Sequence, residues 1–237
     1  MTDATIPKIF ATSAIIGQKL YVLNGEMLDG SLNSTVEVID LKDGSITYTT
    51  DHPLPTRAAG IATWNGKIYT FGGSPGPNIF SNKLFEFDPI TETWKELANM
   101  PFGAETKGEI VDGKLYVFGG FNGKALNKLA IYDIASNTWE KSIEMPMAVS
   151  ANATAIIGDK IYLTGDYTNL NSLIKFETKD SNFKILLDHN LKPRRHCAAE
   201  GINGQLFVMG GNVTSKTNSS ISSVQVVALP DGKTIRP

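Results

Sequence analysis

The sequence predicts an all-β protein built from five similar sheets, and three observations support this. A short apolar segment that ends at or beside a glycine recurs five times in the 237 residues, at 18–25, 66–73, 113–120, 159–166 and 204–211. The equivalent positions are separated by 48, 47, 46 and 45 residues, at Lys19, Lys67, Lys114, Lys160 and Gln205. Such a period is typical of propeller blades and not of helical solenoids. No stretch holds a 3.6-residue apolar stripe over helical length.

Each repeat is expected to supply four short strands. Turn signals separate the first strand from the second, at Asn65-Gly66, Asp112-Gly113, Gly158-Asp159 and Asn203-Gly204. A four-stranded sheet repeated around an axis is a propeller blade. The prediction is therefore a single five-bladed propeller domain over residues 1–237, with repeats at about 8–56, 57–102, 103–147, 148–193 and 194–237.

Glycine pairs and aromatic residues recur in phase with these repeats. Two repeats carry the full pattern of a glycine pair, an aromatic residue with Asp, and a Trp: Gly72-Gly73, Phe87-Asp88 and Trp94, then Gly119-Gly120, Tyr132-Asp133 and Trp139. The other three repeats are degraded, with Asn24-Gly25, Gly165-Asp166 and Gly210-Gly211 at the glycine positions and Phe176 and Phe183 as the aromatic pair of the fourth. The pattern resembles the kelch family over nearly the whole chain. The resemblance implies a kelch-type propeller whose hallmark residues are structural and leave function open.

Composition excludes some partners. Apolar residues make up 41% and charged residues 19%, which fits a globular domain, and the net charge of −2 argues against nucleic acid or an anionic membrane surface as partner. No apolar run approaches the roughly 20 residues of a membrane span, and the chain does not start with a basic secretory signal. A lone Cys197 excludes an internal disulfide. We therefore expect a cytoplasmic monomer without cofactor or metal.

The fifth repeat is short of an outer strand. Residues 2–6 could complete it, because Ile6-Pro7 stands where Met100-Pro101 and Met145-Pro146 stand before the next inner strand. Residues 233–235 are the second option. We favour the first, which joins the two ends of the chain and leaves no open strand edge. Without either, the chain is expected to pair with a second copy or to be part of a larger protein.

Loop lengths indicate which end of the blades binds a ligand. The longer connections run from second to third strand, at 26–34, 74–82, 121–127, 167–171 and 212–222, and between blades, at 51–57, 99–105, 145–150 and 189–196. Long, dissimilar loops on a rigid repeat scaffold are usual recognition surfaces. Phe80, Phe121 and Tyr167 in these loops are either exposed anchors for a partner or covers for the sheet ends.

Alternation along the inner strands gives a sharper prediction. It places Ala14, Ala62, Ala153 and Ala155 on the side that we assign to a central channel, together with charged residues of the third and fifth blades. The predicted ligand-binding residues at this channel and its mouth are Arg57, Glu105, Lys107, Arg194, Arg195, His196, Phe121 and Tyr167.

Two interpretations of the charged residues stay open. In one, they pair with each other in a water-filled channel, as is ordinary in propellers. In the other, Arg57, Arg195 and His196 hold an anionic group by charge-assisted hydrogen bonds. The favoured function is a non-catalytic recognition module that binds a protein segment or a small anionic ligand.

Some kelch proteins are enzymes, and the sequence can be compared with three classes. Copper radical oxidases use paired tyrosines and histidines with a crosslinked cysteine, which three His and one Cys do not match. The Glu, Asp and His motif of iron-dependent specifier proteins is absent. Sialic acid mutarotases have a basic, acidic and polar pocket. The alternative function is therefore a sugar mutarotase or epimerase in which Glu109, Glu200 and His196 transfer protons.

Histidine and cysteine are weak candidates for other chemistry. His52, His189 and His196 all lie in links between blades, but a metal site is unfavoured because they belong to different blades. Cys197 follows three basic residues, yet alternation directs it into the packing between blades. We therefore expect an inert, buried thiol.

Overall fold

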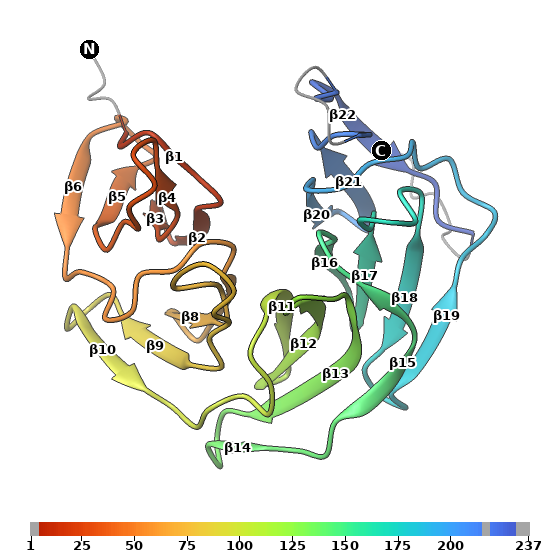
Figure 1. Ribbon diagram of the computed structural model, residues 1–237, viewed down its shortest axis with the longest axis horizontal. Helices are drawn as coiled ribbons and strands as arrows, with labels where there is room; N and C mark the ends of the chain where they lie inside the picture. The colour runs from red at the N-terminus through yellow and green to blue at the C-terminus, as the bar shows by residue number, and fades with distance from the viewer. Residues whose placement is uncertain (1–4, 215–218, 231–237) are drawn as a thin grey trace. The chain divides into compact units, whose positions relative to one another are not determined.

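The computed structural model describes residues 5–214 and 219–230, and every regular element in them is a β-strand (Figure 1). Within these ranges no helix is long and apolar enough to cross a membrane. The chain divides into two compact units: unit 1 contains Met1–Lys124 and Lys128–Ile143, and unit 2 contains Ala125–Asn127 and Glu144–Pro237.

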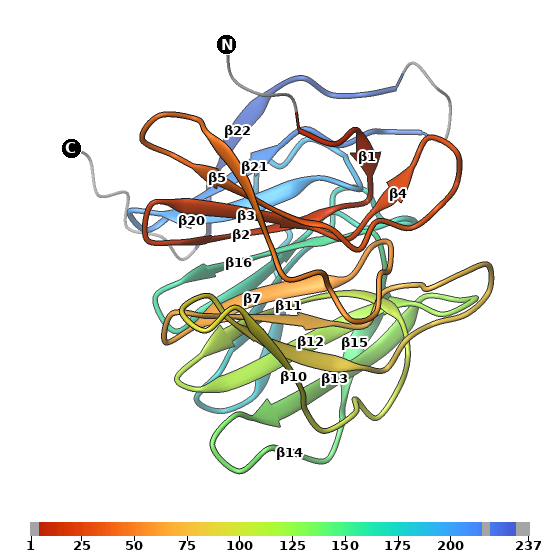
Figure 2. The same ribbon diagram turned by 90° about the vertical axis from the view of Figure 1, so that its left-hand side faces the viewer.

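Unit 1 contains three antiparallel blades whose strands pair in chain order. The first has β2 (Thr12–Ile16), β3 (Lys19–Leu23), β5 (Val36–Asp40) and β6 (Ile46–Thr49), and the second has β7 (Gly60–Trp64), β8 (Lys67–Phe71), β9 (Leu84–Asp88) and β10 (Thr93–Glu96). The third has β11 (Glu105–Val111), β12 (Lys114–Phe121), β13 (Leu126–Asp133) and β14 (Thr138–Trp139). A small sheet of β1 (Lys8–Ile9) and β4 (Glu26–Met27) lies at one end of the first blade (Figure 2).

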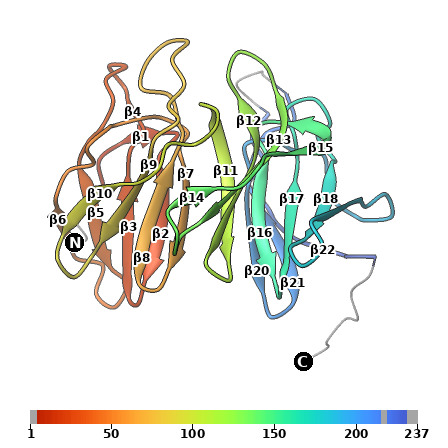
Figure 3. The same cartoon turned by 90° about the horizontal axis from the view of Figure 1, so that it is seen from below.

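Unit 2 contains the fourth and fifth blades. The fourth has β16 (Ala153–Ile157), β17 (Lys160–Thr164), β18 (Leu173–Glu177) and β19 (Asn182–Ile185), and the fifth has β20 (Ala198–Ile202), β21 (Gln205–Met209) and β22 (Val224–Val227). In each unit the first strands of successive blades lie side by side: β2 with β7, β7 with β11, and β16 with β20 (Figure 3). The five predicted kelch-type sheets are thus confirmed.

One predicted link is instead a strand. Residues 143–149 form β15 (Ile143–Val149), which pairs with β13, and β13 itself begins at Leu126 inside the predicted loop. The alternation of Ile143, Met145, Met147 and Val149 is consistent with a strand. The segment was predicted as a link because Met145-Pro146 resembles Met100-Pro101 in the preceding link.

The predicted turns and aromatic pairs are confirmed. Asn65-Gly66, Asp112-Gly113 and Asn203-Gly204 have φ values of 49° and 75°, 49° and 75°, and 51° and 74°, as a type I′ hairpin requires. The ring pairs Phe87–Trp94, Tyr132–Trp139 and Phe176–Phe183 lie opposite each other on the third and fourth strands, with centroids 4.7, 5.0 and 4.7 Å apart. Each Trp also joins its blade to the preceding one: Nε1 of Trp94 donates to Thr50 O at 3.1 Å and that of Trp139 to Ala98 O at 2.8 Å.

The assignment of the inner-strand alanines to the side that faces a central channel is wrong. Ala14 packs with Tyr21 and Leu23 in one core of unit 1, and Ala62 packs with Phe71 in another. In unit 2, Ala155 belongs to the core between the fourth and fifth blades, and Ala153 is also buried. The side chains of an inner strand stand on the two faces of its sheet, so alternation separates the faces of adjoining blades and does not define a channel wall.

The expected completion of the fifth blade by residues 2–6 stays a prediction, because most of that segment lies outside the described residues. The described part of the fifth sheet has three strands, and Ile6 N donates to Glu37 Oε1 in β5 of the first blade, at 2.8 Å. Lys8 Nζ lies 2.5 Å from Glu37 Oε2. A buried carboxylate on this blade attracts the segment. Residues 2–4 and 233–235, the remainder of the two predicted options, lie outside the described residues.

His52 secures the link between the first and second blades. Its Nδ1 accepts the N–H of Leu54 at 3.1 Å, so Nε2 carries the proton and donates to Thr70 Oγ1 at 2.8 Å. The ring packs edge-on against Phe85 and Trp94. Burial lowers the pKa of His52 from 6.5 to about 4, because the charged imidazolium is poorly solvated there.

Unit 1 is therefore expected to lose stability in mild acid. The unfolded chain takes up the His52 proton near pH 6.5 and the folded chain only near pH 4, so the stabilisation is complete above pH 6.5 and is lost as the pH falls toward 4. The loss amounts to about 3 kcal/mol. Urea denaturation of wild type and His52→Gln between pH 4 and 7 measures it, with His189→Gln as control. An equally steep pH dependence in His52→Gln contradicts the prediction.

Candidate functional site

Two arginines occupy the same repeat position in the second and fifth blades. Arg57 exchanges backbone hydrogen bonds with Ser74 at 3.0 and 2.9 Å, and Arg195 does so with Asn212 at 3.0 and 3.0 Å. Ser74 and Asn212 each follow a glycine pair directly. In each of these blades the predicted link and the predicted loop are thus held side by side, as the loop-face prediction requires.

In unit 1 the arginine is neutralised by its neighbours. Arg57 Nη1 lies 3.0 Å from Glu26 Oε2, and Nε lies 3.2 Å from Glu105 Oε1. The hydrogen bond that Arg57 donates to Glu26 is the largest cause of a raised Arg57 pKa. Burial raises the pKa of Glu105, and Arg57 opposes this shift. The Phe10 ring, 6.0 Å away, adds a weak cation–π contact. Arg57 and Glu105 therefore satisfy each other, in line with the first interpretation of the charges.

In unit 2 the arginine has a different partner. The guanidinium of Arg195 lies over the Tyr167 ring, with Cζ 3.9 Å from the ring centroid. Its Nη1 donates to Tyr167 O and its Nε to Asn212 Oδ1, each at 3.3 Å. His196 lies edge-on to Tyr167 with centroids 6.2 Å apart. We name Tyr167, Arg195, His196 and Asn212 the Arg195 cluster.

The Arg195 cluster carries a positive charge that the described residues of unit 2 do not neutralise. No ion pair of Arg195 with a carboxylate is found among the residues that the structure describes, and no hydrogen bond of its Nη2 is found there. Tyr167 stands at the position that Glu26 occupies in the first blade, directly after the glycine position. Because this position holds tyrosine in place of glutamate, Arg195 makes a cation–π contact where Arg57 makes an ion pair. Arg195 is 7% exposed and Tyr167 is 51% exposed, so a buried cation is stacked against an accessible ring.

Arg194 is a structural residue and not part of a ligand site. It is 0% exposed. Its Nη1 donates to Gly210 O at 3.1 Å, Nη2 to Gln225 Oε1 at 3.2 Å, and Nε to Lys192 O at 3.2 Å. The guanidinium thus ties the link to β21 and β22. The prediction of Arg194 as a ligand-binding residue is corrected accordingly.

Two other predicted residues, Lys107 and Phe121, belong to unit 1. Lys107 Nζ donates to Ala59 O at 3.4 Å, and burial lowers the Lys107 pKa while Glu109 opposes the shift. Phe121 ends β12, is 40% exposed and packs edge-on against Phe80 with centroids 5.8 Å apart. The two phenylalanines thus form a half-exposed aromatic pair of their own.

The residues of the catalytic alternative are divided between the units. Glu109 belongs to unit 1, whereas Glu200 and His196 belong to unit 2. Glu200 is exposed, and its Oε1 accepts the N–H of Gly201 at 3.1 Å. The alternative requires a carboxylate screened from water, which Glu200 is not. The sugar mutarotase function stays an untested hypothesis.

The remaining candidates hold the fold together. His189 Nδ1 accepts the N–H of Leu191 at 3.2 Å, the same turn that His52 makes in unit 1. Cys197 packs against the core of unit 2, and burial raises its thiol pKa to about 11. The cysteine is thus protonated at neutral pH, as an inert thiol should be.

The predicted site residues did not include Asn212 and Glu26, which define the two arginine environments. Both follow the glycine position of their repeats, as Tyr167 does. Aligning the five repeats on this position would have paired each with the arginine that it contacts. The sequence therefore held the information needed to predict both residues, in their common position after the glycines of each repeat.

Comparisons with known proteins agree with the fold. The family profile described as KLHDC2/KLHL20/DRC7 Kelch-repeats domain matches residues 2–166. The chain is 26% identical to Kelch repeat and BTB domain-containing protein 12 of Danio rerio over 70% of its length. It is 23% identical to Kelch-like protein 25 of Xenopus tropicalis over 96% and 28% identical to Kelch-like protein terF of Aspergillus terreus over 67%. It spans 31%, 43% and 37% of these relatives.

Proposed function

Because the chain belongs to the kelch-repeat family, we propose that it is a non-catalytic recognition module that binds an acidic segment of a partner protein at the Arg195 cluster. Kelch hallmarks build the scaffold, so function resides in the side chains that differ between repeats. The observation that carries the proposal is the contrast between Arg57, which has two carboxylate partners, and Arg195, which has none among the described residues.

The chemistry of the cluster favours an acidic protein segment. A carboxylate that reaches Nη2 of Arg195 completes the pairing that Glu26 and Glu105 give Arg57. The half-exposed Tyr167 ring offers apolar area beside that charge, and tyrosine and arginine are enriched among the residues that dominate binding energy. His196 adds a second hydrogen-bonding side chain, edge-on to the Tyr167 ring. Asn212 and the backbone hold the guanidinium in place before a ligand arrives.

The proposal is tested by selecting peptides from a random display library and measuring their affinities by fluorescence anisotropy. Peptides rich in Asp and Glu should be enriched. Tyr167→Ala and Arg195→Lys should each weaken binding about tenfold, because lysine keeps the charge but loses the planar stack and the fork of donors. Affinity should fall as salt rises.

Matched controls separate recognition from folding. Tyr48 is an exposed tyrosine of the first blade, and Arg57 occupies the repeat position of Arg195. Tyr48→Ala and Arg57→Lys should leave the affinity unchanged. Selection of no acidic peptide, or equal binding by Tyr167→Ala and wild type, would contradict the proposal. Binding of free carboxylates or phosphate with the same dependence on Arg195 would point to a small anion instead.

A further inference from the structure

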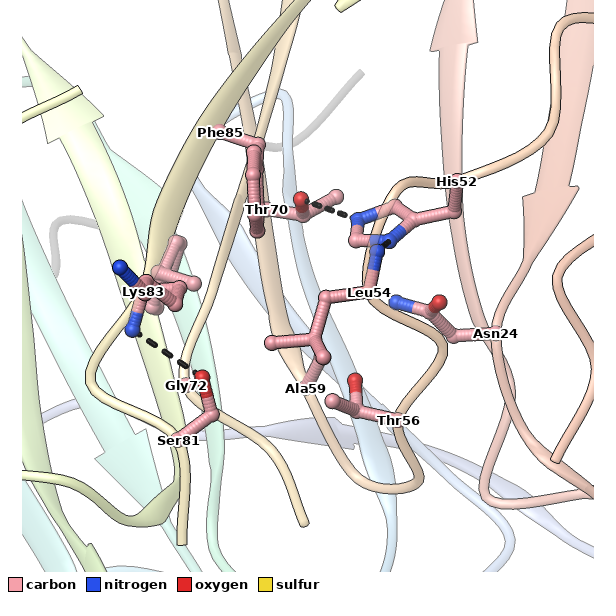
Figure 4. Close-up of a pocket in the computed structure, with 11 residues that line it drawn as sticks. Asn24, His52, Leu54, Thr56, Ala59, Thr70, Gly72, Ser81, Lys83 and Phe85 are labelled. Carbon is pink, nitrogen blue, oxygen red and sulfur yellow. Dashed lines mark hydrogen bonds between the residues drawn. The ribbon is translucent and has the colours of Figure 1, made fainter. Parts of the chain in front are cut away.

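Unit 1 contains a small cavity beneath the link between the first and second blades (Figure 4). Its volume is about 10 Å³, which is room for the centre of a single water molecule. Asn24 lines it from the first blade, Leu54 and Thr56 from the link, and Thr70 from the second blade.

The cavity is lined by polar atoms that have no hydrogen-bond partner among the described residues. Asn24 is 0% exposed and Thr56 is 2% exposed. Nδ2 and Oδ1 of Asn24 and Oγ1 of Thr56 are buried and have no hydrogen-bond partner among the described residues. Figure 4 shows the Asn24 amide and the Thr56 hydroxyl directed toward the space beside Leu54. Buried polar groups are rarely left without a partner, so these three atoms call for one.

Other polar groups around the cavity are already satisfied. His52 Nε2 is bonded to Thr70 Oγ1 at 2.8 Å, and Ser81 Oγ accepts the N–H of Lys83 at 3.0 Å. The Lys83 ammonium lies 2.5 Å from Glu96 Oε1. Among the described residues that line the cavity, the polar atoms without a hydrogen-bond partner therefore belong to Asn24 and Thr56. Both side chains are neutral, which argues against a bound ion.

Asn24 stands where the other four repeats have the first glycine of the pair: Gly72, Gly119, Gly165 and Gly210. Its φ is 59°, in the left-handed region that asparagine tolerates better than other residues with a side chain. The first blade is thus the one repeat that places an amide at this point of the scaffold.

We propose that this cavity binds one ordered water molecule, held by the amide of Asn24 and the hydroxyl of Thr56. A buried water typically makes about three hydrogen bonds, and three side-chain atoms are on offer. The water links the glycine position of the first blade to the link that leads into the second. It gives the departure from glycine at position 24 a structural role.

Direct evidence comes from nuclear Overhauser effects between water and the side-chain amide protons of Asn24 in wild-type protein. Effects of the sign that marks a long-lived water are expected at Asn24 and at the Thr56 hydroxyl or methyl. Their absence at both residues would overturn the proposal. This measurement requires no variant and does not depend on any partner of the protein.

Substitutions give a second test, because a hydrated cavity and a dry cavity predict different changes in the midpoint of thermal unfolding. Thr56→Val removes one ligand of the water, so the midpoint of thermal unfolding should fall by about 2–4 °C, and Thr56→Ser should restore it. Thr49 is the matched control, since its Oγ1 is also buried and lacks a hydrogen-bond partner in the described part of the chain, but Thr49 does not line the cavity. Thr49→Val should leave the midpoint unchanged or raise it. If the cavity is dry, Thr56→Val should leave the midpoint of thermal unfolding unchanged or raise it, as Thr49→Val does. That result would refute the water site.

Discussion

Gly201→Ala is expected to destabilise unit 2 by about 3 kcal/mol or more. Gly201 lies in β20, and a Cβ built on it would stand 1.8 Å from the carbonyl oxygen of Ile156 in β16 and 2.9 Å from Ile157 Cγ1. The nearest obstacle is backbone, which cannot rotate away as a side chain can. The two inner strands would have to separate, and the core on Ala155 and Ala199 between the fourth and fifth blades would open with them.

Gly204→Ala is the matched control in the adjoining turn. Gly204 has a φ of +74° with nothing within 4 Å of its added Cβ, so alanine there costs only the left-handed backbone, about 1–2 kcal/mol. Urea denaturation compares the free energies of unfolding, and hydrogen exchange of the β16 and β20 amides locates the loss. Equal destabilisation by the two substitutions would contradict the steric argument.

The repeats could be predicted from the sequence because their signals are local. A type I′ turn needs positive φ at two adjacent residues, so Asn65-Gly66 indicates a hairpin without knowledge of the rest. The pairing of Phe176 with Phe183 follows from a fixed offset across one hairpin. Such features depend on a few neighbouring residues and survive even where a repeat has lost its Trp.

The candidate site was predictable only in part, because its partners come from different blades. The sequence predicted Arg194 and Arg195 together at the loop end, but only the fold shows that Arg194 donates to the carbonyl groups of Lys192 and Gly210. The neutralisation of Arg57 requires acids from the blades before and after its own. Long-range pairing of this kind leaves no trace in spacing unless repeats are aligned position by position.

The N-terminal segment shows the same limit. Glu37 lies between Val36 and Val38 in a buried strand, and an acid in such a place signals a partner without naming it. The structure identifies that partner as Lys8, with the Ile6 N–H as a second donor. The buried acid at position 37 indicates that a basic partner must pack against the first blade, and the N-terminal segment supplies that partner.

Lys8→Met is expected to cost about 3–5 kcal/mol, since it leaves the Glu37 carboxylate buried without its counter-charge. The side chains of Glu37 and Lys8 are 0% and 3% exposed, and Glu37 is fixed in the middle of β5, so it cannot turn to water. Glu37→Leu should cost less, because β1 pairs with β4 at only two positions and can release the lysine into solvent.

A double-mutant cycle at pH 7 tests this asymmetry by urea denaturation. The double variant Lys8→Met/Glu37→Leu should be more stable than Lys8→Met alone, because replacing both members of a buried ion pair by apolar groups removes the uncompensated charge. The coupling energy then measures the pair in its buried setting. A loss below about 1 kcal/mol for Lys8→Met, the value of an exposed ion pair, would show that water reaches Glu37 and that the segment does not seal the first blade.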